Sequence, residues 1–482
     1  MTNFRLQLER TYSELPDIFF TKLSPTPVSN PEMIIFNEQL AIETGLHFSG
    51  MTEGDKTKFL SGNHIPEGIE PFAQAYAGHQ FGNFTMLGDG RAIVLGEHLT
   101  PSGQRLDIQL KGSGRTPYSR GGDGRAALGP MLREYVISEA MHALGIPTTR
   151  SLAVITTGEK VLRENELPGA ILSRIAGSHI RVGTFEFASL HQDKTITQTL
   201  LDHLNDRHFP EIKDKENQPL ALLEAAIDQQ ADLITHWMRV GFIHGVMNTD
   251  NMALSGETID YGPCAFMDIF APDTVFSSID HKGRYAYANQ PYIAQWNLAR
   301  FAESLLPLIE GKREEIIDLL EDSLNKFESI YKKKWLVMMS TKLGFTANSQ
   351  EDETLVTDLL DWMHKNEADY TNTFRDLSQE ELPGGELYTT ESFQAWHTRW
   401  QARLREEDLE SSLTLRKSVN PAVIPRNHKV EEALQAGEEG DLEPFHNLLK
   451  ALEKPYEEAD HLAPYQVPPK PSEKVHQTFC GT

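Results

Sequence analysis

The sequence predicts an α+β protein with two lobes, in which a small β-rich lobe with one key helix precedes a larger, mostly helical lobe with a C-terminal extension. Between residues 84 and 175, short apolar runs show the alternation of strands, with a single helical stretch among them. After residue 222, apolar side chains recur mainly at helical spacing. At 482 residues the chain is longer than one ordinary domain. We therefore expect four parts, which are an N-terminal extension at residues 1–70, the small lobe at 71–178, the core of the large lobe at 179–320 and a helical C-terminal extension with an irregular tail at 321–482.

The strands of the small lobe are predicted in close succession. Residues 84–98 hold two apolar runs around Gly88-Asp89-Gly90-Arg91, a pattern that favours a hairpin with a tight turn and a loop that covers a nucleotide. The next predicted strand is 105–111, which ends at Lys111, and a glycine-rich loop follows at 112–124. The remaining predicted strands are 151–156 and 170–175.

One helix is predicted inside the small lobe and several in the large lobe. Residues 128–144 carry apolar side chains at helical spacing, with Glu134 in the second turn, and Gly145-Ile146-Pro147 ends the helix. Prolines make an irregular tail the expected structure of 456–471. The further predicted helices are 222–240, 294–309, 316–336, 354–364 and 392–406.

The charge distribution limits the classes of ligand. The formal net charge of −25 would repel a polyanion, so nucleic acid is a poor general partner. Between residues 105 and 133 the sign reverses, because six basic residues stand against Asp107 and Asp123. A local cationic pocket in an acidic protein suits a small phosphorylated ligand.

Cysteine usage and hydropathy bear on the cellular compartment. With only Cys264 and Cys480, the chain has neither a disulfide framework nor a thiolate cluster for zinc. The first fifteen residues lack the apolar run of a secretory signal, and no later stretch is apolar enough to cross a bilayer. We therefore expect a cytoplasmic protein without a membrane partner.

Four residues form a pattern that is typical of phosphoryl-transfer sites, which need a cation on the phosphates and oxygen ligands for a divalent metal. Lys111 at a strand end and Glu134 on the following helix match the ion pair of protein kinases. A loop is predicted at 241–251, and a short hairpin, whose two strands meet at Ser255-Gly256, joins Asn251 to Asp260. Asp260-Tyr261-Gly262 is a variant of the kinase D-F-G. These residues predict a protein-kinase-like fold that binds ATP and a divalent metal.

The base of an ordinary kinase is missing from this pattern. His244-Gly245-Val246 occupies the place of the kinase H-R-D, so Val246 stands where the catalytic Asp is expected. The nearest carboxylate is Asp250, which could orient a hydroxyl from a different angle. The alternative is that Asp250 only caps backbone amides of its own loop.

Two arginines indicate an unusual orientation of the nucleotide. Arg174 and Arg181 lie at and just after the last strand of the small lobe, where a kinase binds adenine. Guanidinium groups favour phosphates over a purine edge, which suggests that ATP binds turned around, with its α-phosphate nearest the metal. The alternative is that both arginines form salt bridges with the acidic large lobe.

Longer motifs resemble the selenoprotein O family, whose members are pseudokinases that act as protein adenylyltransferases. The resemblance is dense between residues 70 and 310 and looser beyond them. The motifs that carry it are Tyr76-Ala77-Gly78-His79-Gln80-Phe81-Gly82, Gln109-Leu110-Lys111-Gly112-Ser113-Gly114, Asp123-Gly124-Arg125-Ala126, Gly245-Val246-Met247-Asn248-Thr249-Asp250-Asn251 and Asp260-Tyr261-Gly262-Pro263.

The resemblance implies transfer of AMP from an inverted ATP to Ser, Thr or Tyr hydroxyls of target proteins, with release of pyrophosphate. It implies that Asp250 is the base and that Asn251 and Asp260 hold Mg²⁺. Some relatives also transfer UMP, usually with Mn²⁺. The residues at positions where the family contacts ATP are Gly88, Gly90, Arg91, Lys111, Asp123, Gly124, Arg174, Arg181 and Asp260.

Cys480 matches another family feature, because some members end with a selenocysteine or cysteine third from the C-terminus. A redox role for Cys480 is one interpretation. The tail cysteine of relatives pairs with a residue near Val275-Phe276-Ser277, where this chain has no cysteine, so Cys264 is the only candidate partner within the chain. The alternative is a buried Cys264 and an unpaired tail thiol.

Two functions of other classes stay open on the sequence. A conventional kinase would transfer the γ-phosphate, and a nucleotide-sensing scaffold would bind ATP without turnover. The helices between residues 321 and 470 either support the active lobe or recruit targets.

Overall fold

The computed structural model describes residues 7–48, 50–191, 193–347 and 349–479. Its β-rich lobe contains one antiparallel sheet with the order β1-β3-β5-β6-β9-β8-β2, in which β4 also pairs with β3 and β7 with β9. The strands are β1 Phe20–Lys22, β2 Glu32–Phe36, β3 Phe72–Gln80, β4 Asn83–Gly88, β5 Ala92–Leu99, β6 Arg105–Lys111, β7 Ala126–Ala127, β8 Arg150–Leu162 and β9 Glu166–Ala176. In the helical lobe, β10 Phe242–Ile243 pairs with β11 Ala265–Phe266.

The first seventy residues contribute strands to both ends of this sheet order. β1 pairs with β3 at one end, and β2 pairs with β8 at the other. The segment expected as an N-terminal extension therefore shares backbone hydrogen bonds with the small lobe. The division of the chain into four parts stays a prediction.

The predicted hairpin at residues 84–98 is wrong in its pairing. Strands β4 and β5 form there, but both pair with β3, since Gly88 is the partner of Ala75 and Val94 is the partner of Phe72. Three residue steps along β3, from Phe72 to Ala75, thus lie opposite six steps along the segment from Gly88 to Val94. The segment therefore has three extra residues, which form a bulge around Gly88-Asp89-Gly90-Arg91. The tight turn lies instead at Phe81 and Gly82, which both have positive φ angles of 51° and 83°.

The predicted helices are present, with shifted ends. The helix at 128–144 is α3 Leu128–Ala143, and the helix at 222–240 is α6 Gln218–Val240. The others correspond to α7 Gln290–Leu305, α8 Arg313–Lys342, α9 Gln350–Lys365 and α11 Glu391–Leu404. Helices that the sequence analysis did not predict are α1 Glu38–Thr44, α2 Glu53–Leu60, α4 Val182–Ser189, α5 Lys194–His208, α10 Tyr370–Asp376, α12 Leu409–Val419, α13 Asn427–Glu438, α14 Glu443–Leu452 and the short α15 Ala463–Gln466.

The two short strands predicted to meet at Ser255-Gly256 do not pair with each other. A turn forms there, and Gly256 has a positive φ of 77°. On one side of the turn, Ala253 bridges to Arg181, and on the other side Thr258 bridges to Thr148. The two segments pair with the small lobe and with its connection to α4. These tertiary contacts replace the local hairpin pairing that was predicted.

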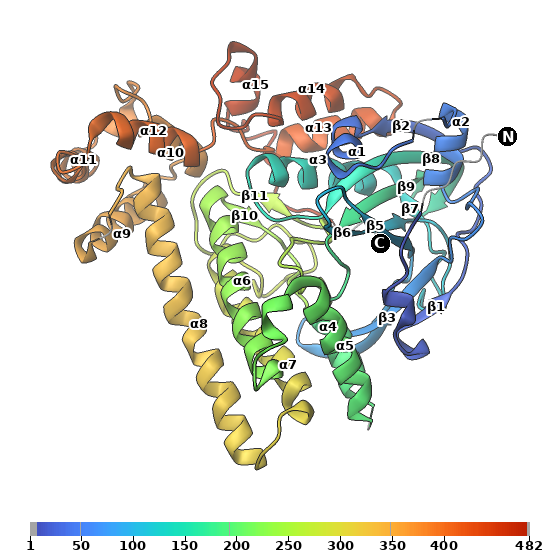
Figure 1. Cartoon of the computed structure of the whole chain (residues 1–482). Helices are drawn as coiled ribbons and strands as arrows, with labels where there is room; N and C mark the ends of the chain where they lie inside the picture. The colour runs from blue at the N-terminus through green and yellow to red at the C-terminus, as the bar shows by residue number, and fades with distance from the viewer. Residues whose placement is uncertain (1–6, 49, 192, 348, 480–482) are drawn as a thin grey trace.

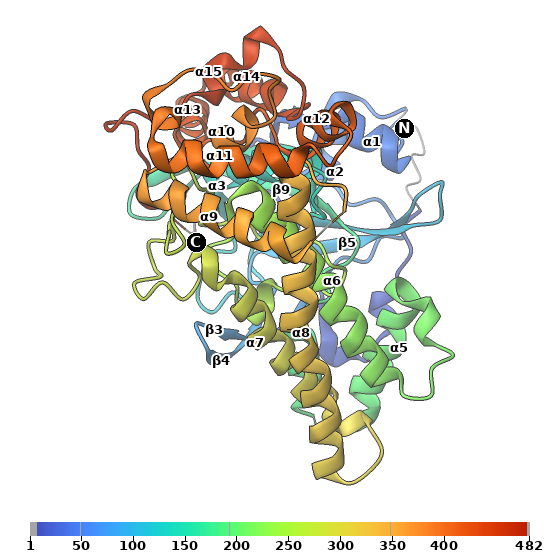
Figure 2. The ribbon, with the colours of Figure 1, turned by 90° about the vertical axis from the view of Figure 1, so that its left-hand side faces the viewer.

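The lobes are arranged so that α3 lies between the sheet and the C-terminal helices. In Figure 1 the sheet lies on the right, and α6, α7 and α8 run side by side below α3; Figure 2 shows the same three helices together from another side. Helices α13 and α14 pack on α3, where Arg133 pairs with Glu431 and the Gly129 N–H donates to Glu438 Oε1 at 3.1 Å. The predicted α+β, two-lobed fold class is confirmed. Among the helices described, none is both long and apolar enough to cross a membrane.

Candidate active site

A buried ion-pair cluster joins the two lobes. Lys111, the last residue of β6, donates through Nζ to Glu134 Oε2 at 2.6 Å and to Asp260 Oδ1 at 2.8 Å. Glu134 is brought there by α3, whose apolar face is buried against the sheet. Asp260 follows the turn at Ser255-Gly256. The cluster thus links a strand, a helix and the large lobe through one lysine.

Arg174 completes this cluster and is itself only 2% exposed. It lies on β9 opposite Gln109 of β6. Its Nη1 donates to Glu134 Oε1 at 3.0 Å and to Asp260 Oδ1 at 2.7 Å, while its Nε and Nη2 donate to Gln109 Oε1 at 3.1 and 2.6 Å. Each nitrogen of this guanidinium therefore already has an acceptor. Its salt bridge with Asp260 joins it to the large lobe, as the alternative weighed for this arginine expected, whereas its salt bridge with Glu134 lies within the small lobe.

Asp260 has an unusual backbone and a strongly perturbed carboxyl group. Its φ of 63° lies in the left-handed region, which non-glycine residues rarely adopt outside strained or functional sites. Burial opposes ionisation, but Lys111, Arg174 and Arg181 together hold the pKa of Asp260 well below its ordinary value. Asp260 is therefore ionised at neutral pH. Its Oδ2 lies 3.7 Å from Arg181 Nη2, whereas Oδ1 bonds Lys111 and Arg174.

Arg181 is buried but incompletely paired. It precedes α4 and lies over the ring of Tyr76, at 4.3 Å from the ring centre. Its Nη1 is 3.6 Å from Asp89 Oδ1, too long for a good hydrogen bond. Within the described residues, its Nε and Nη1 have no hydrogen-bond partner although they are buried. Buried donors of a charged group are costly when unpaired, so this site favours an added anionic acceptor.

Asp250 lies on a short 3-10 turn, Thr249–Asn251, next to Gly78 of β3. A Cβ atom at position 78 would overlap the Asp250 carboxylate, so the absence of a side chain there gives the carboxylate room. Its Oδ1 is buried and accepts no hydrogen bond from the part of the chain that is described. Burial raises the pKa of Asp250 to about 6, although Arg181 acts in the opposite direction. Val246, at the kinase base position, is a buried apolar side chain.

Asn251 and Asp260 suit a divalent metal. Asn251 donates through Nδ2 to the carbonyl oxygen of Val246 at 2.9 Å, which fixes the amide and leaves its Oδ1 as a free ligand atom on chemical grounds. In the described ranges, no three His, Cys, Asp or Glu side chains gather as metal ligands. Mg²⁺ often binds through one or two protein oxygens together with phosphate oxygens and water, so this pair fits it.

The glycine-rich loop packs on the bulge at Gly88-Asp89-Gly90-Arg91. Thr116 Oγ1 donates to the Asp89 carbonyl at 2.7 Å, and Ser119 Oγ donates to the Gly90 carbonyl at 2.5 Å. The Gly112 N–H donates to the Arg91 carbonyl at 2.7 Å, next to Lys111. At Gly88, with φ of 150°, a Cβ would overlap the ring of Tyr118. The structure therefore brings Gly88, Gly90 and Arg91 next to the strand end that carries Lys111.

Two predicted residues lie apart from the cluster. Asp123 is exposed, and its contacts in the described part of the chain are with Arg163, at 2.9 Å, and the Arg125 N–H. Its hydrogen bond with Arg163 lowers the pKa of Asp123. Gly124 closes the loop, since its carbonyl accepts from the Gly114 N–H at 3.0 Å. These contacts support a loop-forming role and do not join either residue to Asp260.

Cys480 lies outside the described residues, and Cys264 is buried. The described end of the tail nevertheless reaches the segment after Asp260-Tyr261-Gly262. The Thr478 N–H donates to the Phe276 carbonyl at 2.7 Å, and Thr478 Oγ1 donates to the Pro263 carbonyl at 2.6 Å.

Sequence reasoning missed the roles of Asp89 and Gln109. Asp89 is 3% exposed, and burial raises its pKa. Gln109 is fully buried and accepts from Arg174 through Oε1. Both residues stood inside motifs that were noticed for their glycines or for Lys111. A polar residue between Ile108 and Leu110, in a strand buried on both faces, was the available signal.

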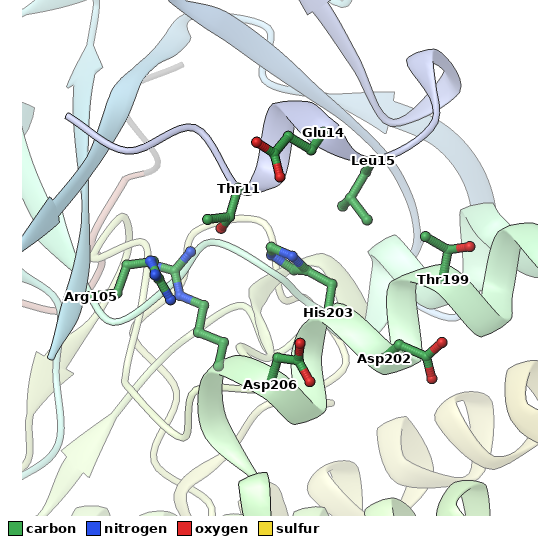
Figure 3. A pocket seen from close by; sticks show the side chains of 9 residues that line it. Thr11, Glu14, Leu15, Arg105, Thr199, Asp202, His203 and Asp206 are labelled. Carbon is green, nitrogen blue, oxygen red and sulfur yellow. The ribbon is translucent and has the colours of Figure 1, made fainter. Parts of the chain in front are cut away.

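A separate cavity lies at the other end of β6. It has a volume of about 400 Å³ and is lined by residues that include Thr11, Arg105, His203 and Arg207 (Figure 3). Arg105 and Lys111 are the first and last residues of β6, which puts them about 20 Å apart at 3.3 Å per residue. This cavity is therefore not part of the Lys111–Asp260 cluster.

Comparison with known proteins agrees with this geometry. A family described as "Protein adenylyltransferase SelO" matches residues 2–453. A protein of Alcanivorax borkumensis, named "Protein nucleotidyltransferase YdiU", is 58% identical over 482 residues, which cover 99% of each chain. Proteins of the same name from Nitrosococcus oceani and Brevibacillus brevis are each 57% identical over 477 residues, which cover 98% of this chain and 97% of theirs. The chain therefore belongs to the SelO family of nucleotidyltransferases.

Proposed function

We propose that this chain transfers AMP from ATP to Ser, Thr or Tyr hydroxyls of target proteins, with Mg²⁺ and with ATP bound in the inverted orientation. The observation that carries the proposal is the buried Arg181, which has unpaired donors and lies close enough to Asp250 and Asp260 to interact with both charges. The printed names of the relatives, protein nucleotidyltransferases, and of the family, a protein adenylyltransferase, support the same reaction class.

In the proposed ATP site, the role of each basic side chain depends on how many of its donors already have an acceptor in the protein. Arg181 has free donors and would bind phosphate oxygens directly. Lys111 would share its ammonium group between Glu134, Asp260 and a phosphate. Arg174 is fully engaged in the cluster, so its main contribution would be to hold Asp260 ionised and in place. The bulge at Gly88-Asp89-Gly90-Arg91 would cover the phosphates with backbone groups.

Asn251 Oδ1 and Asp260 Oδ2 would hold the metal. Bound there, Mg²⁺ would neutralise charge that develops on the α-phosphate and the leaving pyrophosphate. The left-handed backbone at Asp260 and the hydrogen bond from Asn251 Nδ2 to the Val246 carbonyl fix the directions of the two ligand side chains before anything binds.

In the proposed reaction Asp250 takes the proton of the target hydroxyl. The hydroxyl oxygen forms a bond to the α-phosphorus, the bond from that phosphorus to the bridging oxygen breaks, and pyrophosphate leaves with the electron pair. The pKa of Asp250, about 6, suits a base that is mostly ionised at neutral pH yet retains proton affinity. Val246 cannot replace it, because an alkyl side chain accepts no proton.

The position of the isotope in ATP tests the proposal. Incubation of the protein and a cell lysate with ATP labelled at the α-phosphorus should label target proteins, whereas ATP labelled at the γ-phosphorus should not. Label from the γ position alone would instead establish a conventional kinase. No label from either position, with stabilisation by ATP and no pyrophosphate release, would establish a nucleotide-sensing scaffold.

A second arm of the experiment addresses the nucleotide and the metal. The same assay with α-labelled UTP, in Mg²⁺ or Mn²⁺, distinguishes AMP transfer from UMP transfer. We expect the larger rate with ATP and Mg²⁺. Faster labelling with UTP and Mn²⁺ would keep the nucleotidyltransferase class and replace the proposed donor and metal. Peptide mass spectrometry would then identify the modified hydroxyl residues.

A further inference from the structure

A hydrogen-bonded chain of three side chains spans the two lobes beside Asp250. His79 Nδ1 bonds Glu186 Oε1. Glu186 Oε2 accepts from Thr249 Oγ1 at 2.5 Å, and Thr249 Oγ1 accepts from the His79 N–H at 2.7 Å. His79 is on β3, Glu186 is on α4, and Thr249 begins the 3-10 turn that carries Asp250. The three residues thus form a closed ring of hydrogen bonds.

The same part of β3 is fixed to the loop of Asp250 at a second point. The Phe81 N–H donates to Asn248 Oδ1 at 3.0 Å, and this oxygen also accepts from the Tyr285 hydroxyl at 2.7 Å. The side chain of Glu186 is only 5% exposed, so its bonds to His79 and Thr249 form in a medium that screens them weakly. These contacts determine where the turn at Thr249–Asn251 lies relative to β3.

The Asp250 carboxylate also accepts a hydrogen bond from the side chain of Gln80, which lies on the same strand as His79. Asp250 Oδ1 is buried without a hydrogen-bond donor among the described residues, and the neighbouring Gly78 offers no side chain. We infer that His79, Glu186 and Thr249 are positioning residues that hold the Asp250 carboxylate against β3, at the angle needed to accept a proton from the target hydroxyl. They act through the backbone of the turn and do not touch the reacting atoms.

This inference rests on the proposed function, in which Asp250 is the base. It goes beyond the proposed function by naming the residues that orient the base. Substitution of a group that merely stabilises the fold would lower the melting temperature, and the enzyme that remains folded would keep its turnover. Substitution of a positioning group instead lowers kcat of the folded enzyme and leaves the apparent affinity for ATP unchanged.

The central test removes one hydroxyl. Thr249→Val keeps the shape of the side chain but can neither donate to Glu186 nor accept from the His79 N–H. We expect kcat for protein labelling to fall by about 10- to 100-fold, the usual range for outer partners of a site, with KM for ATP within about twofold. Thr249→Ser restores the hydroxyl and should recover most of kcat.

A matched control uses the same substitution elsewhere. Thr235 is buried in α6, and its hydroxyl donates to the Ala231 carbonyl of its own helix. Thr235→Val should leave kcat unchanged, whatever it does to the melting temperature. Equal loss of kcat in Thr235→Val and Thr249→Val would overturn the inference, because it would assign the effect to general destabilisation.

Glu186→Gln provides an independent way to interrupt the hydrogen bonds among His79, Glu186 and Thr249. It removes the negative charge that binds Thr249 and His79 and preserves the size of the side chain. If the three residues act as one unit, the double variant Thr249→Val with Glu186→Gln should lose little more activity than the worse single variant. Multiplicative losses would mean that the residues act separately and would refute a single positioning chain.

Failure of this inference differs from failure of the proposed function. Wild-type enzyme without label from the α-phosphorus contradicts the proposed function. Labelling by the wild type together with unchanged kcat in Thr249→Val and Glu186→Gln contradicts only the positioning chain. A raised metal requirement in Thr249→Val, at unchanged saturating kcat, would show that the chain positions Asn251 and would also overturn the role proposed for Asp250.

Discussion

The two halves of the candidate site differ in how completely their polar groups are paired. Around Asp260, Lys111 and all three nitrogens of Arg174 donate to carboxylate or amide oxygens at 2.6 to 3.1 Å. Around Asp250, buried donors of Arg181 and one carboxylate oxygen have no partner among the described residues. The polar groups of the first half are mostly paired with one another, whereas the second half keeps buried polar atoms that the described part of the chain does not pair.

The two carboxylates are perturbed in opposite directions for the same reason. Burial opposes the ionisation of each. Asp260 has Lys111 and Arg174 within 2.8 Å, so its pKa falls well below the ordinary value. Asp250 has Arg181 as its main cationic neighbour and ends with a pKa of about 6. One carboxylate that stays charged and one that can hold a proton near neutral pH therefore lie ten positions apart in the sequence.

Asp260→Ala should have the largest effect, because it removes the anion shared by three cations. We expect transfer to fall on the order of 10³-fold or more, together with loss of metal-dependent ATP binding. The rate of pyrophosphate release and the ATP-dependent shift in melting temperature, with and without Mg²⁺, measure the two effects. Retention of metal-dependent binding would exclude Asp260 as a metal ligand.

Asp250→Asn should slow transfer by about 10²- to 10⁴-fold and leave ATP binding in place, because it removes only a proton acceptor. An equal loss of ATP binding would make Asp250 a structural residue or a ligand. In the wild type, kcat/KM should rise with pH through about 6 and fall about tenfold per unit below it, since only the ionised carboxylate accepts a proton.

Asp250→Asn also makes a prediction about stability. The pKa of Asp250 is raised from 3.8 to about 6 in the folded chain. The folded state therefore binds this proton more tightly than the unfolded state, and ionisation lowers stability as the pH rises from about 4 to about 6. Asp250→Asn should accordingly raise the melting temperature more at pH 7 than at pH 4. A pH-independent change would contradict the raised pKa.

Arg174→Met and Arg181→Met compare the two halves directly. Loss of Arg174 leaves Glu134 and Asp260 with one cation fewer, so the free energy of unfolding should fall by about 3 kcal/mol. Loss of Arg181 removes donors that are already unpaired, so ATP affinity should fall about 10- to 100-fold with a smaller loss of stability. Urea unfolding measures the change in stability of each variant, and calorimetric titration measures its ATP affinity. If Arg174→Met lost more ATP affinity and Arg181→Met lost more stability, the two roles would be reversed.

Asp123→Ala should have the smallest effect. Its carboxylate is 45% exposed and pairs with Arg163 at the surface, so unfolding should change by less than about 0.5 kcal/mol. If Asp123 contributes only to the loop, KM for ATP should also stay within about twofold. A tenfold rise in KM would instead support the ATP contact that the family resemblance implies.

Lys111, Glu134 and Asp260, which meet in the structure, could be singled out from the sequence because each is tied to local order, at the end of a strand, in the second turn of a helix or beside a turn. The metal-binding role of Asn251 stays a prediction. The bulge at Gly88-Asp89-Gly90-Arg91 was mistaken for a hairpin. Local pattern shows where a chain bends but not which strand it then pairs with, and β3 lies upstream of both strands that pair with it.

The sequence by itself determined the two-lobed α+β class, the Lys111–Glu134 pair and the loss of the kinase base at Val246, because these depend on residue type and short-range periodicity. Only the tertiary structure decided which arginine is already paired, and that His79, Glu186 and Thr249 meet beside Asp250. Hydrogen bonds between residues 107 or 170 positions apart leave no local pattern. They form where the packing of β3 against α4 brings distant segments within 3 Å.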